Sequence, residues 1–280
     1  MAIVDLHLHS DKSDGELAPA ALVGLAAGAG LRVMALTDHD TTAGLDAAVS
    51  AAESLLVCIP GIEITTRHAH EQHILGYNID YKSERFSDFM ARLMKMRRER
   101  AENILEYLRK NGVGLSYERT ESLVQSRYIG RPQIARAMVA EGYVASIGEA
   151  FRSYLSGSSF RKVPRPKPTA EEAIAEIMAA GGVAVLAHPY TLHLDGAELE
   201  RAVRSLKEQG LGGLECHYGE YSKDWTAELT AIAEGLGLIV TGGSDFHGQS
   251  VKPEVEIATG RSGMLDFNDL GVAGKLARRG

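Results

Sequence analysis

The sequence predicts an α/β protein: a barrel of about seven strand–helix units that is interrupted by a helical insertion. Two observations support this fold class. Seven short apolar runs recur along the chain, and most of them are followed by a segment with helical periodicity. The alternation stops between residues 82 and 167, where the pattern becomes helical and positive charge accumulates.

The seven apolar runs have the length and composition of short buried strands. In chain order they span residues 3–6, 33–36, 55–59, 74–75, 183–187, 213–216 and 238–240. Strands that alternate with helices form a parallel sheet. We therefore expect their carboxyl ends at one rim of the barrel, where the active sites of such barrels lie.

Helical segments with many alanines lie between several of these runs. They span residues 19–29, 45–54, 170–180, 199–208 and 227–234. Thr169, which is followed by two glutamates, is the expected N-cap of one of them. Glycines that follow the apolar periodicity predict where three helices end, at Gly30, Gly181 and Gly210.

The insertion divides the chain into two predicted domains, a barrel of residues 1–81 and 168–280 and a helical insertion of residues 82–167. Within the insertion we expect helices at 86–110, 131–140 and 146–154, a loop at 157–159 and an extended proline-rich linker at 163–168. The insertion contains 18 Lys and Arg against 9 Asp and Glu, whereas the rest of the chain contains 12 against 28. The excess of positive charge in the insertion suits anion binding. The alternative is that these residues form a solvated basic helix surface.

The composition is that of an ordinary globular protein, with 45% hydrophobic and 24% charged residues in a chain of 280. No stretch has the ~18 consecutive apolar residues of a membrane span, and the N-terminus has no signal-peptide pattern. Cys58 and Cys216 are expected to be buried free thiols, which fits a reducing cytoplasm. We therefore expect a cytoplasmic protein without membrane contact, and no feature indicates an obligate protein partner.

Six histidines and three acidic residues follow or lie near the predicted strands. The set is His7, His9, Asp14, His39, Glu63, His73, His188, Asp245 and His247. Nine potential ligands exceed the four of one tetrahedral zinc site, so we expect two or three divalent ions. Mixed imidazole and carboxylate ligands suit zinc, manganese or iron and do not single one out; we take manganese as the first choice among them. Polar residues that merely cap strands would explain one histidine, but not nine residues at six places.

Several neighbouring divalent ions suit phosphoryl chemistry, because they neutralise a phosphate and lower the pKa of a bridging water. The predicted reaction is attack of a metal-bridging hydroxide on phosphorus, with the charge of the leaving oxygen offset by the ions.

The motifs resemble those of the polymerase and histidinol phosphatase (PHP) family, within the amidohydrolase-like barrels. They are Asp5-Leu6-His7-Leu8-His9-Ser10 with Asp14-Gly15, Thr37-Asp38-His39-Asp40, Gly61-Ile62-Glu63, His73-Ile74-Leu75-Gly76-Tyr77, Ala187-His188-Pro189 and Gly243-Ser244-Asp245-Phe246-His247. The resemblance extends along nearly the whole chain and implies a distorted seven-stranded (β/α)7 barrel with a trinuclear site.

The resemblance also implies how the ligands are shared. One ion would be held by His7, His9, Glu63 and Asp245, a second by Glu63, His73 and His188, and a third by Asp14, His39 and His247. Many members of the family have histidine where Asp14 stands. We expect the aspartate to weaken the third site or to change its metal preference. Glu63, Asp245 and His193 are the candidate catalytic residues.

Substrate-binding candidates lie in the insertion and after His188. The segment Tyr128-Ile129-Gly130-Arg131-Pro132-Gln133-Ile134-Ala135 resembles the helix-opening motif of PHP phosphoesterases that act on nucleotide bisphosphates or, as 5′-3′ exonucleases, on short RNA and single-stranded DNA. Arg131 at a helix N-terminus can bind phosphate, with a surface salt bridge as the alternative. Gln133 would contact phosphate or base, or face solvent. His193 would bind phosphate or protonate the leaving oxygen.

The leading hypothesis is a phosphohydrolase that removes phosphate from a small nucleotide, such as a 3′,5′-nucleotide bisphosphate, and leaves a 5′-mononucleotide. The 6% aromatic content favours a small substrate, because proteins that bind single strands usually present aromatic stacking surfaces. The alternatives are a 5′-3′ exonuclease on short RNA or single-stranded DNA, a histidinol-phosphate phosphatase, and a catalytically silent metal-bound scaffold.

Overall fold

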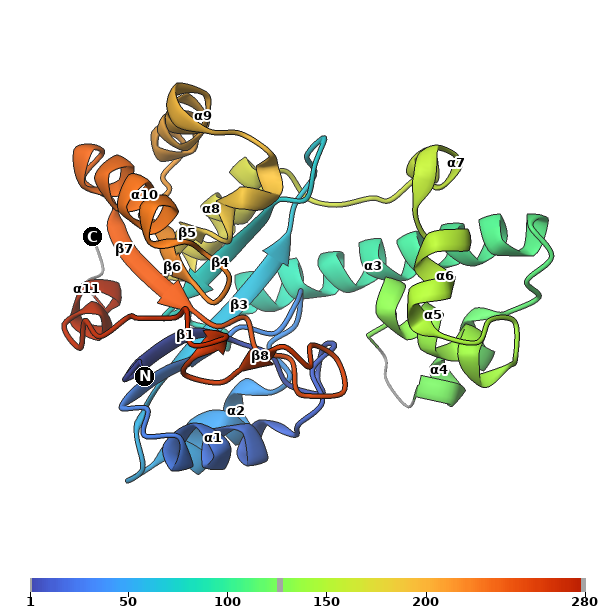
Figure 1. Ribbon diagram of the computed structural model, residues 1–280, viewed down its shortest axis with the longest axis horizontal. Helices are drawn as coiled ribbons and strands as arrows, with labels where there is room; N and C mark the ends of the chain where they lie inside the picture. Colours follow the sequence, from blue (N-terminus) through green and yellow to red (C-terminus); the bar gives the residue numbers. More distant parts are fainter. Residues whose placement is uncertain (1, 125–127, 278–280) are drawn as a thin grey trace. The chain divides into compact units, whose positions relative to one another are not determined.

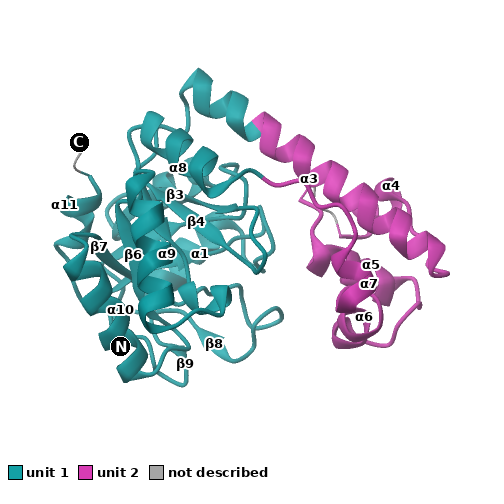
Figure 2. Cartoon of the chain, turned by 90° about the horizontal axis from the view of Figure 1, so that it is seen from above, with its two compact units in different colours: residues 1–90, 168–280 teal, residues 91–167 magenta. Residues whose placement is uncertain are grey.

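The computed structural model describes residues 2–124 and 128–277. The chain divides into two compact units, residues 1–90 with 168–280 and residues 91–167, which Figure 2 shows in different colours. The sequence places this division before the long helix α3 (Glu84–Lys110), whereas the structure places it inside α3, after Met90. The difference arises because Phe86 and Phe89, both at most 2% exposed, belong to the first unit although they lie on α3.

Seven strands form one sheet in chain order. They are β1 (Val4–Leu8), β2 (Val33–Leu36), β3 (Val57–Thr65), β4 (His73–Tyr77), β5 (Val183–Leu186), β6 (Gly213–Tyr218) and β7 (Ile239–Gly243). A parallel bridge joins Leu8 to Phe246, just beyond β7, so the sheet is nearly closed into a barrel. The predicted α/β barrel of seven strands is therefore confirmed.

The expectation of an all-parallel sheet is wrong at β4, which pairs antiparallel with both β3 and β5. Residues 66–72 join β3 directly to β4. A parallel connection needs a dozen or more residues, so this link is too short for one. As a result Thr65, the last residue of β3, pairs with His73, the first residue of β4, and His73 lies at the rim of the strand ends.

Helices lie outside the sheet in the first unit (Figure 1). They are α1 (Pro19–Gly28), α2 (Leu45–Ala52), α8 (Ala170–Ala179), α9 (Gly196–Glu208) and α10 (Lys223–Gly235). A 3-10 helix, η1 (Pro189–Leu192), follows β5. The ribbon of β8 (Val255–Glu256) and β9 (Gly260–Arg261) and the helix α11 (Val272–Leu276), none of them expected from the sequence, follow β7.

The expected helix boundaries are largely those observed. Thr169 Oγ1 accepts a hydrogen bond from Glu172 N at 3.0 Å, which confirms the predicted N-cap of α8. Gly30, Gly181 and Gly210 have φ values of 87°, 72° and 107°, as the left-handed residue after a helix requires. Cys58 is half-buried and Cys216 is buried, and both are free thiols as predicted.

The second unit is helical. It contains the rest of α3 together with α4 (Tyr117–Val124), α5 (Arg131–Ala140), α6 (Ile147–Ser153) and α7 (Gly157–Arg161). The loop expected at 157–159 is instead the start of α7. The helix forms there because Phe160 is buried, with its ring 5.8 Å from that of Tyr107. Among the described helices, none is both long and apolar enough to cross a membrane.

Candidate metal centre

All nine predicted ligands belong to the first unit and come together at one end of the barrel. His7 lies in β1, Glu63 in β3 and His73 at the start of β4. The other six lie in the loops that follow β1, β2, β5 and β7, namely His9, Asp14, His39, His188, Asp245 and His247. Every side chain in the set is buried except that of His39, which is 13% exposed.

Glu63 occupies the middle of the set, and its two carboxylate oxygens face different histidines. Oε1 lies 2.7 Å from His73 Nδ1 and 2.8 Å from His188 Nε2. Oε2 lies 3.2 Å from His7 Nε2, 3.3 Å from His9 Nε2 and 2.9 Å from His39 Nδ1. A carboxylate placed in this way can bridge two cations.

Asp245 joins the first group of ligands from the opposite side. Its Oδ1 lies 3.6 Å from His7 Nε2 and 3.2 Å from His9 Nε2. Ligand atoms of these three residues and Glu63 all lie within 4.8 Å of one another. This is the arrangement that one cation with four ligands requires.

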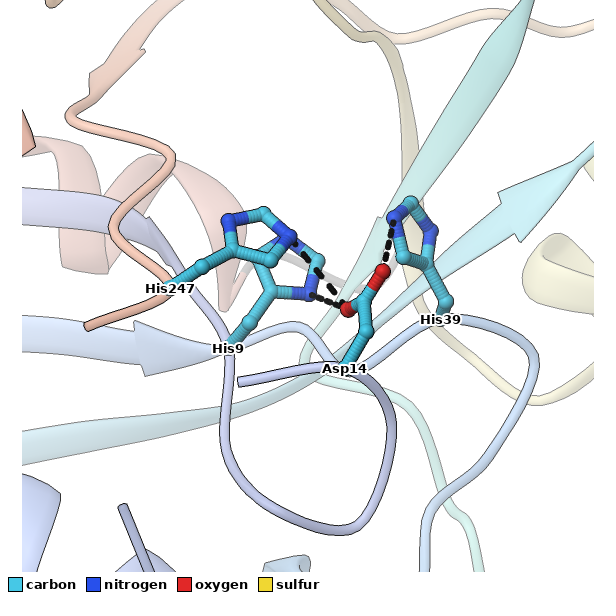
Figure 3. Close-up of side chains that lie close together, drawn as sticks. All are labelled: His9, Asp14, His39 and His247. Carbon is cyan, nitrogen blue, oxygen red and sulfur yellow. Dashed lines mark ion pairs between the residues drawn. The ribbon is translucent and has the colours of Figure 1, made fainter. Parts of the chain in front are cut away.

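A further group surrounds Asp14 (Figure 3). The Oδ1 atom of Asp14 lies 3.3 Å from His247 Nε2 and 3.9 Å from His9 Nδ1, and its Oδ2 atom lies 3.8 Å from His39 Nε2. His9 and His39 each turn one ring nitrogen toward Asp14 and the other toward Glu63. The two groups of ligands are therefore contiguous.

Two glycines allow the backbone to approach the ligands closely. A Cβ atom on Gly243 would lie 2.3 Å from His7 Cβ, and one on Gly15 would lie 2.4 Å from the carbonyl oxygen of His9. Neither contact is sterically possible, so both positions require glycine.

Two of the nine residues have backbone conformations that L-residues rarely adopt. His188 has φ of 22° and Asp245 has φ of 56°. Hydrogen bonds hold both, since His188 N donates to Glu215 Oε2 at 2.6 Å and Asp245 N donates to the His7 carbonyl at 2.9 Å. Such conformations cost about 1–3 kcal/mol each and cluster at functional sites.

Electrostatics of the set favour bound cations. Burial acts to raise the pKa of Asp14, Glu63 and Asp245, yet neighbouring histidines and, at Asp245, Lys252 hold each pKa well below its usual value. Burial acts to lower the pKa of His9, but Asp245 and Glu63 raise it to about 9.

Burial outweighs the nearby carboxylates at His73 and His247 and lowers the pKa of each to about 4. The carboxylates are thus ionised and the imidazoles of His73 and His247 neutral, as metal ligands need to be, whereas the raised pKa of His9 means that this residue must lose a proton to bind an ion.

Unsatisfied polar atoms provide a test of whether these residues fit metal ions. Within the described ranges 2–124 and 128–277, four of the predicted ligands have buried atoms without a hydrogen-bond partner: His7 Nε2, both ring nitrogens of His9, Asp14 Oδ1 and Glu63 Oε2. Buried polar atoms are nearly always paired, and here the orphaned atoms point at one another from the predicted ligand groups. The residues therefore fit divalent cations.

Sequence reasoning missed Glu215, which supports two of the histidines. It is fully buried in β6, its Oε1 lies 2.9 Å from His7 Nδ1, and its Oε2 accepts from His188 N. The contact fixes the His7 tautomer, so that Nε2 is free to bind a cation. Its signal in the sequence is weak: a single acidic residue inside an apolar strand.

Sequence reasoning also missed Tyr218 and Lys252. Tyr218 O–H donates to Asp245 Oδ2 at 2.7 Å, and Lys252 Nζ donates to the same oxygen at 2.5 Å. Asp38 is a further missed residue with a supporting role. Its carboxylate accepts from the Ser10 and Ser13 hydroxyls at 2.6 Å and so holds the loop that carries Asp14.

None of the three predicted substrate-binding residues is a member of these ligand groups. His193 is exposed at the end of η1, with its ring centroid 4.9 Å from that of His70. Arg131 and Gln133 belong to the second unit, where the Arg131 guanidinium lies 5.8 Å from the Phe151 ring centroid. Gln133 is 1% exposed and its Oε1 accepts from Gly130 N at 3.1 Å, so it is not the solvent-facing amide considered from the sequence. Their contact with substrate stays a prediction.

The family model for the PHP domain matches residues 5–187. The 5′-3′ exoribonuclease Rnm of Escherichia coli (strain K12) is 36% identical over 249 residues, which cover 88% of this chain and 85% of the relative. The 3′,5′-nucleoside bisphosphate phosphatase of Chromobacterium violaceum is 32% identical over 250 residues, 88% of each chain.

Solved structures agree with the sequence relatives. A Bifidobacterium adolescentis protein assigned as a metal-dependent phosphoesterase superposes with a TM-score of 0.83 at 33% identity, over 99% of this chain and 96% of its own. An amidohydrolase from Chromobacterium violaceum with bound sulfate and no metal superposes with a TM-score of 0.79 at 31% identity, over 89% and 90%. The chain therefore belongs to the PHP family, and it is a metal-dependent hydrolase of phosphoric esters.

Proposed function

We propose that the nine clustered residues hold two or three divalent ions, with manganese as the working metal, and that the site hydrolyses a phosphoester of a nucleotide. The leading substrate is a 3′,5′-nucleotide bisphosphate, which is converted to a 5′-mononucleotide. One observation carries this proposal: the two oxygens of Glu63 face two different sets of histidines, as a carboxylate shared between ions must.

Bound divalent ions would activate water and offset the charge on the phosphate. The protein side chains position the reactants. Glu63 and Asp245 hold the ligand sets together, and Glu215 keeps the proton of His7 on Nδ1 so that Nε2 faces the centre. Without bound cations, the buried carboxylates of Asp14, Glu63 and Asp245 would repel an anionic substrate. Binding of the substrate phosphate would therefore depend on the metal ions.

The 5′-3′ exonuclease is the second candidate, because relatives with 34–36% identity are named 5′-3′ exoribonucleases. The two activities are one reaction. Water attacks the phosphorus on the 3′ oxygen of a 5′-phosphorylated nucleotide, the P–O3′ bond breaks, and the 3′ oxygen takes up a proton. A bisphosphate then gives a 5′-mononucleotide and phosphate. An RNA gives a 5′-mononucleotide and a 5′-phosphorylated chain one nucleotide shorter.

A comparison of substrates tests this proposal. The manganese-loaded protein is assayed with a 3′,5′-nucleotide bisphosphate, a 5′-phosphorylated five-nucleotide RNA and histidinol phosphate, and parallel assays replace manganese by zinc or iron. We expect the highest kcat/KM with the bisphosphate and manganese. A strong preference for the RNA would replace the leading substrate by the exonuclease, and a preference for histidinol phosphate would overturn both.

Substrate contacts of Arg131, Gln133 and His193 are part of the proposal. The net positive charge of residues 82–167 supports phosphate binding by Arg131, and the exposure of His193 leaves its imidazole accessible. Replacement of each residue by Ala is expected to raise KM for the bisphosphate. An unchanged KM would remove that residue from the substrate site. We also place the protein in the cytoplasm, where its two free cysteines would stay reduced.

A further inference from the structure

We propose that Lys252 is a phosphate-binding residue of this centre, and that it contacts the substrate phosphate next to the ions held by Asp245. This inference rests on the proposed function and names one residue that recognises its substrate. The position of Lys252, its contact with Asp245 and its partial exposure carry the argument.

The loop that carries Lys252 is anchored to the metal-ligand loops. It follows His247 and turns at Gly248, whose φ of 101° suits glycine, and Lys252 N donates to Gly248 O at 2.9 Å. The turn is fixed from outside, because Ser250 N donates to Glu16 Oε2 at 2.9 Å and Glu16 N donates to His247 O at 2.8 Å. The base of the Lys252 side chain is therefore fixed relative to the ligands.

The two oxygens of Asp245 have different environments. Oδ1 faces the imidazoles of His7, His9 and His247 at 3.6, 3.2 and 3.4 Å. Oδ2 instead accepts from Tyr218 and Lys252. The ammonium group of Lys252 thus contacts one oxygen of Asp245, while the other oxygen faces the atoms that would bind an ion. A phosphate oxygen bound to that ion would come within reach of Lys252 Nζ.

The side chain of Lys252 opens toward solvent. It is 34% exposed, whereas that of Asp245 is 8% exposed. Tyr190, which is 42% exposed, is a near neighbour of the centre, with its ring 6.1 Å from that of His188. A cation at an open edge of a deeply buried acidic centre is accessible to an arriving anion. Lysine binds phosphate as a point charge and needs no fixed geometry.

A purely supporting role is the alternative for Lys252, because its contact with Asp245 could serve only to orient that ligand. Tyr218 offers an internal comparison, since it donates to the same oxygen but is 2% exposed. If both residues only orient Asp245, their loss should have the same consequences. If Lys252 also binds phosphate, only its loss should weaken anion binding.

The test compares Lys252→Met, Lys252→Arg and Tyr218→Phe with the wild type, all loaded with manganese. Calorimetry gives the Kd of inorganic phosphate, steady-state assays give kcat and KM for the 3′,5′-bisphosphate, and elemental analysis gives the manganese content. Lys275→Met is the matched control, because Lys275 is 51% exposed and bonds Asp269 on the surface. It should leave every parameter unchanged.

We expect Lys252→Met to raise the phosphate Kd and the KM by about tenfold to a hundredfold, the range for a charge-assisted hydrogen bond, with manganese content and melting temperature retained. Lys252→Arg should restore most of the affinity, and Tyr218→Phe should leave the phosphate Kd unchanged.

Two results would overturn the proposal. One is that Lys252→Met and Tyr218→Phe both lose manganese while their phosphate Kd stays unchanged. The other is that Lys252→Met has the phosphate Kd and KM of the wild type. If wild type binds phosphate but does not hydrolyse the bisphosphate, the proposed function fails, and the phosphate Kd still decides the role of Lys252.

Discussion

Glu215 provides the sharpest test of how the centre is organised, because it contacts two of the predicted ligands, His7 and His188, and is not itself one of them. Its carboxylate accepts from His7 Nδ1 at 2.9 Å and from His188 N at 2.6 Å, and it is fully buried. In Glu215→Gln the amide oxygen can replace only one of the two acceptors. The amide NH2 then faces the other donor, which is left without a partner.

The expected loss of manganese affinity in Glu215→Gln follows from these contacts in two ways. Loss of one hydrogen bond to a charged group, with its donor left buried, costs about 1.5–3 kcal/mol. Loss of a carboxylate that orients a metal-bound histidine typically lowers metal affinity about tenfold to a hundredfold, which is about 1.4–2.8 kcal/mol. The two routes agree, so Glu215→Gln should weaken manganese binding by about one to two orders of magnitude.

Titration calorimetry of manganese into the metal-free protein measures this change directly, and the manganese dependence of hydrolysis measures it again. Saturating manganese should recover most of the turnover, because no group that touches the substrate has been removed. Glu208→Gln, an exposed position at the end of α9, is the matched control and should bind manganese like the wild type. Wild-type manganese affinity in Glu215→Gln would refute the view that Glu215 orients His7 and His188.

Three further predictions concern the ligands and their surroundings. Glu63→Ala should abolish turnover and lower the bound manganese per chain in elemental analysis, because both ligand sets lose an oxygen; full activity would contradict a shared ligand. Asp245 and Glu63 overcome burial and raise the pKa of His9 to about 9, so His9 must lose a proton when metal binds. Manganese affinity should therefore rise between pH 7 and 9, and a calorimetric Kd that does not change with pH would contradict this. Gly243→Ala should lower the free energy of unfolding by about 1–3 kcal/mol in denaturant titrations, because its Cβ would collide with His7. Gly24→Ala, in open space on α1, is the control and should raise the free energy of unfolding by about 0.5–1 kcal/mol. Equal effects of the two substitutions would contradict the close approach of the Gly243 backbone to His7.

The candidate ligands could be predicted to lie together from the sequence because each follows or lies near an apolar run. An apolar run predicts a buried strand, and a polar residue at its end predicts a side chain at the rim, whichever residues pack behind it. His39, His188 and Asp245 satisfy this rule, since they lie two or three residues after the ends of β2, β5 and β7. The rule needs no knowledge of long-range contacts, and so single-sequence reasoning was sufficient for them.

The supporting residues could not be found in this way. Glu215 lies within the buried strand β6, and only its contacts with His7 and His188, which are distant in the sequence, show that it supports the predicted ligands. Lys252 lies in a loop without periodicity, and its role depends on the path of the chain after His247. Roles of this kind depend on tertiary packing, which local patterns do not encode.

His73 shows how a correct position can follow from an incorrect assumption. In an all-parallel barrel, the first residue of a strand lies at the rim opposite the last residues of its neighbours, so His73 could not have reached Glu63. The antiparallel direction of β4 removes the conflict, because it pairs His73 with Thr65 and brings His73 Nδ1 to 2.7 Å from Glu63 Oε1. The sequence contains the signal, since residues 66–72 are too few for a helical crossover. The direction of this one strand is therefore what brings His73 to Oε1 of Glu63, the oxygen that also faces His188.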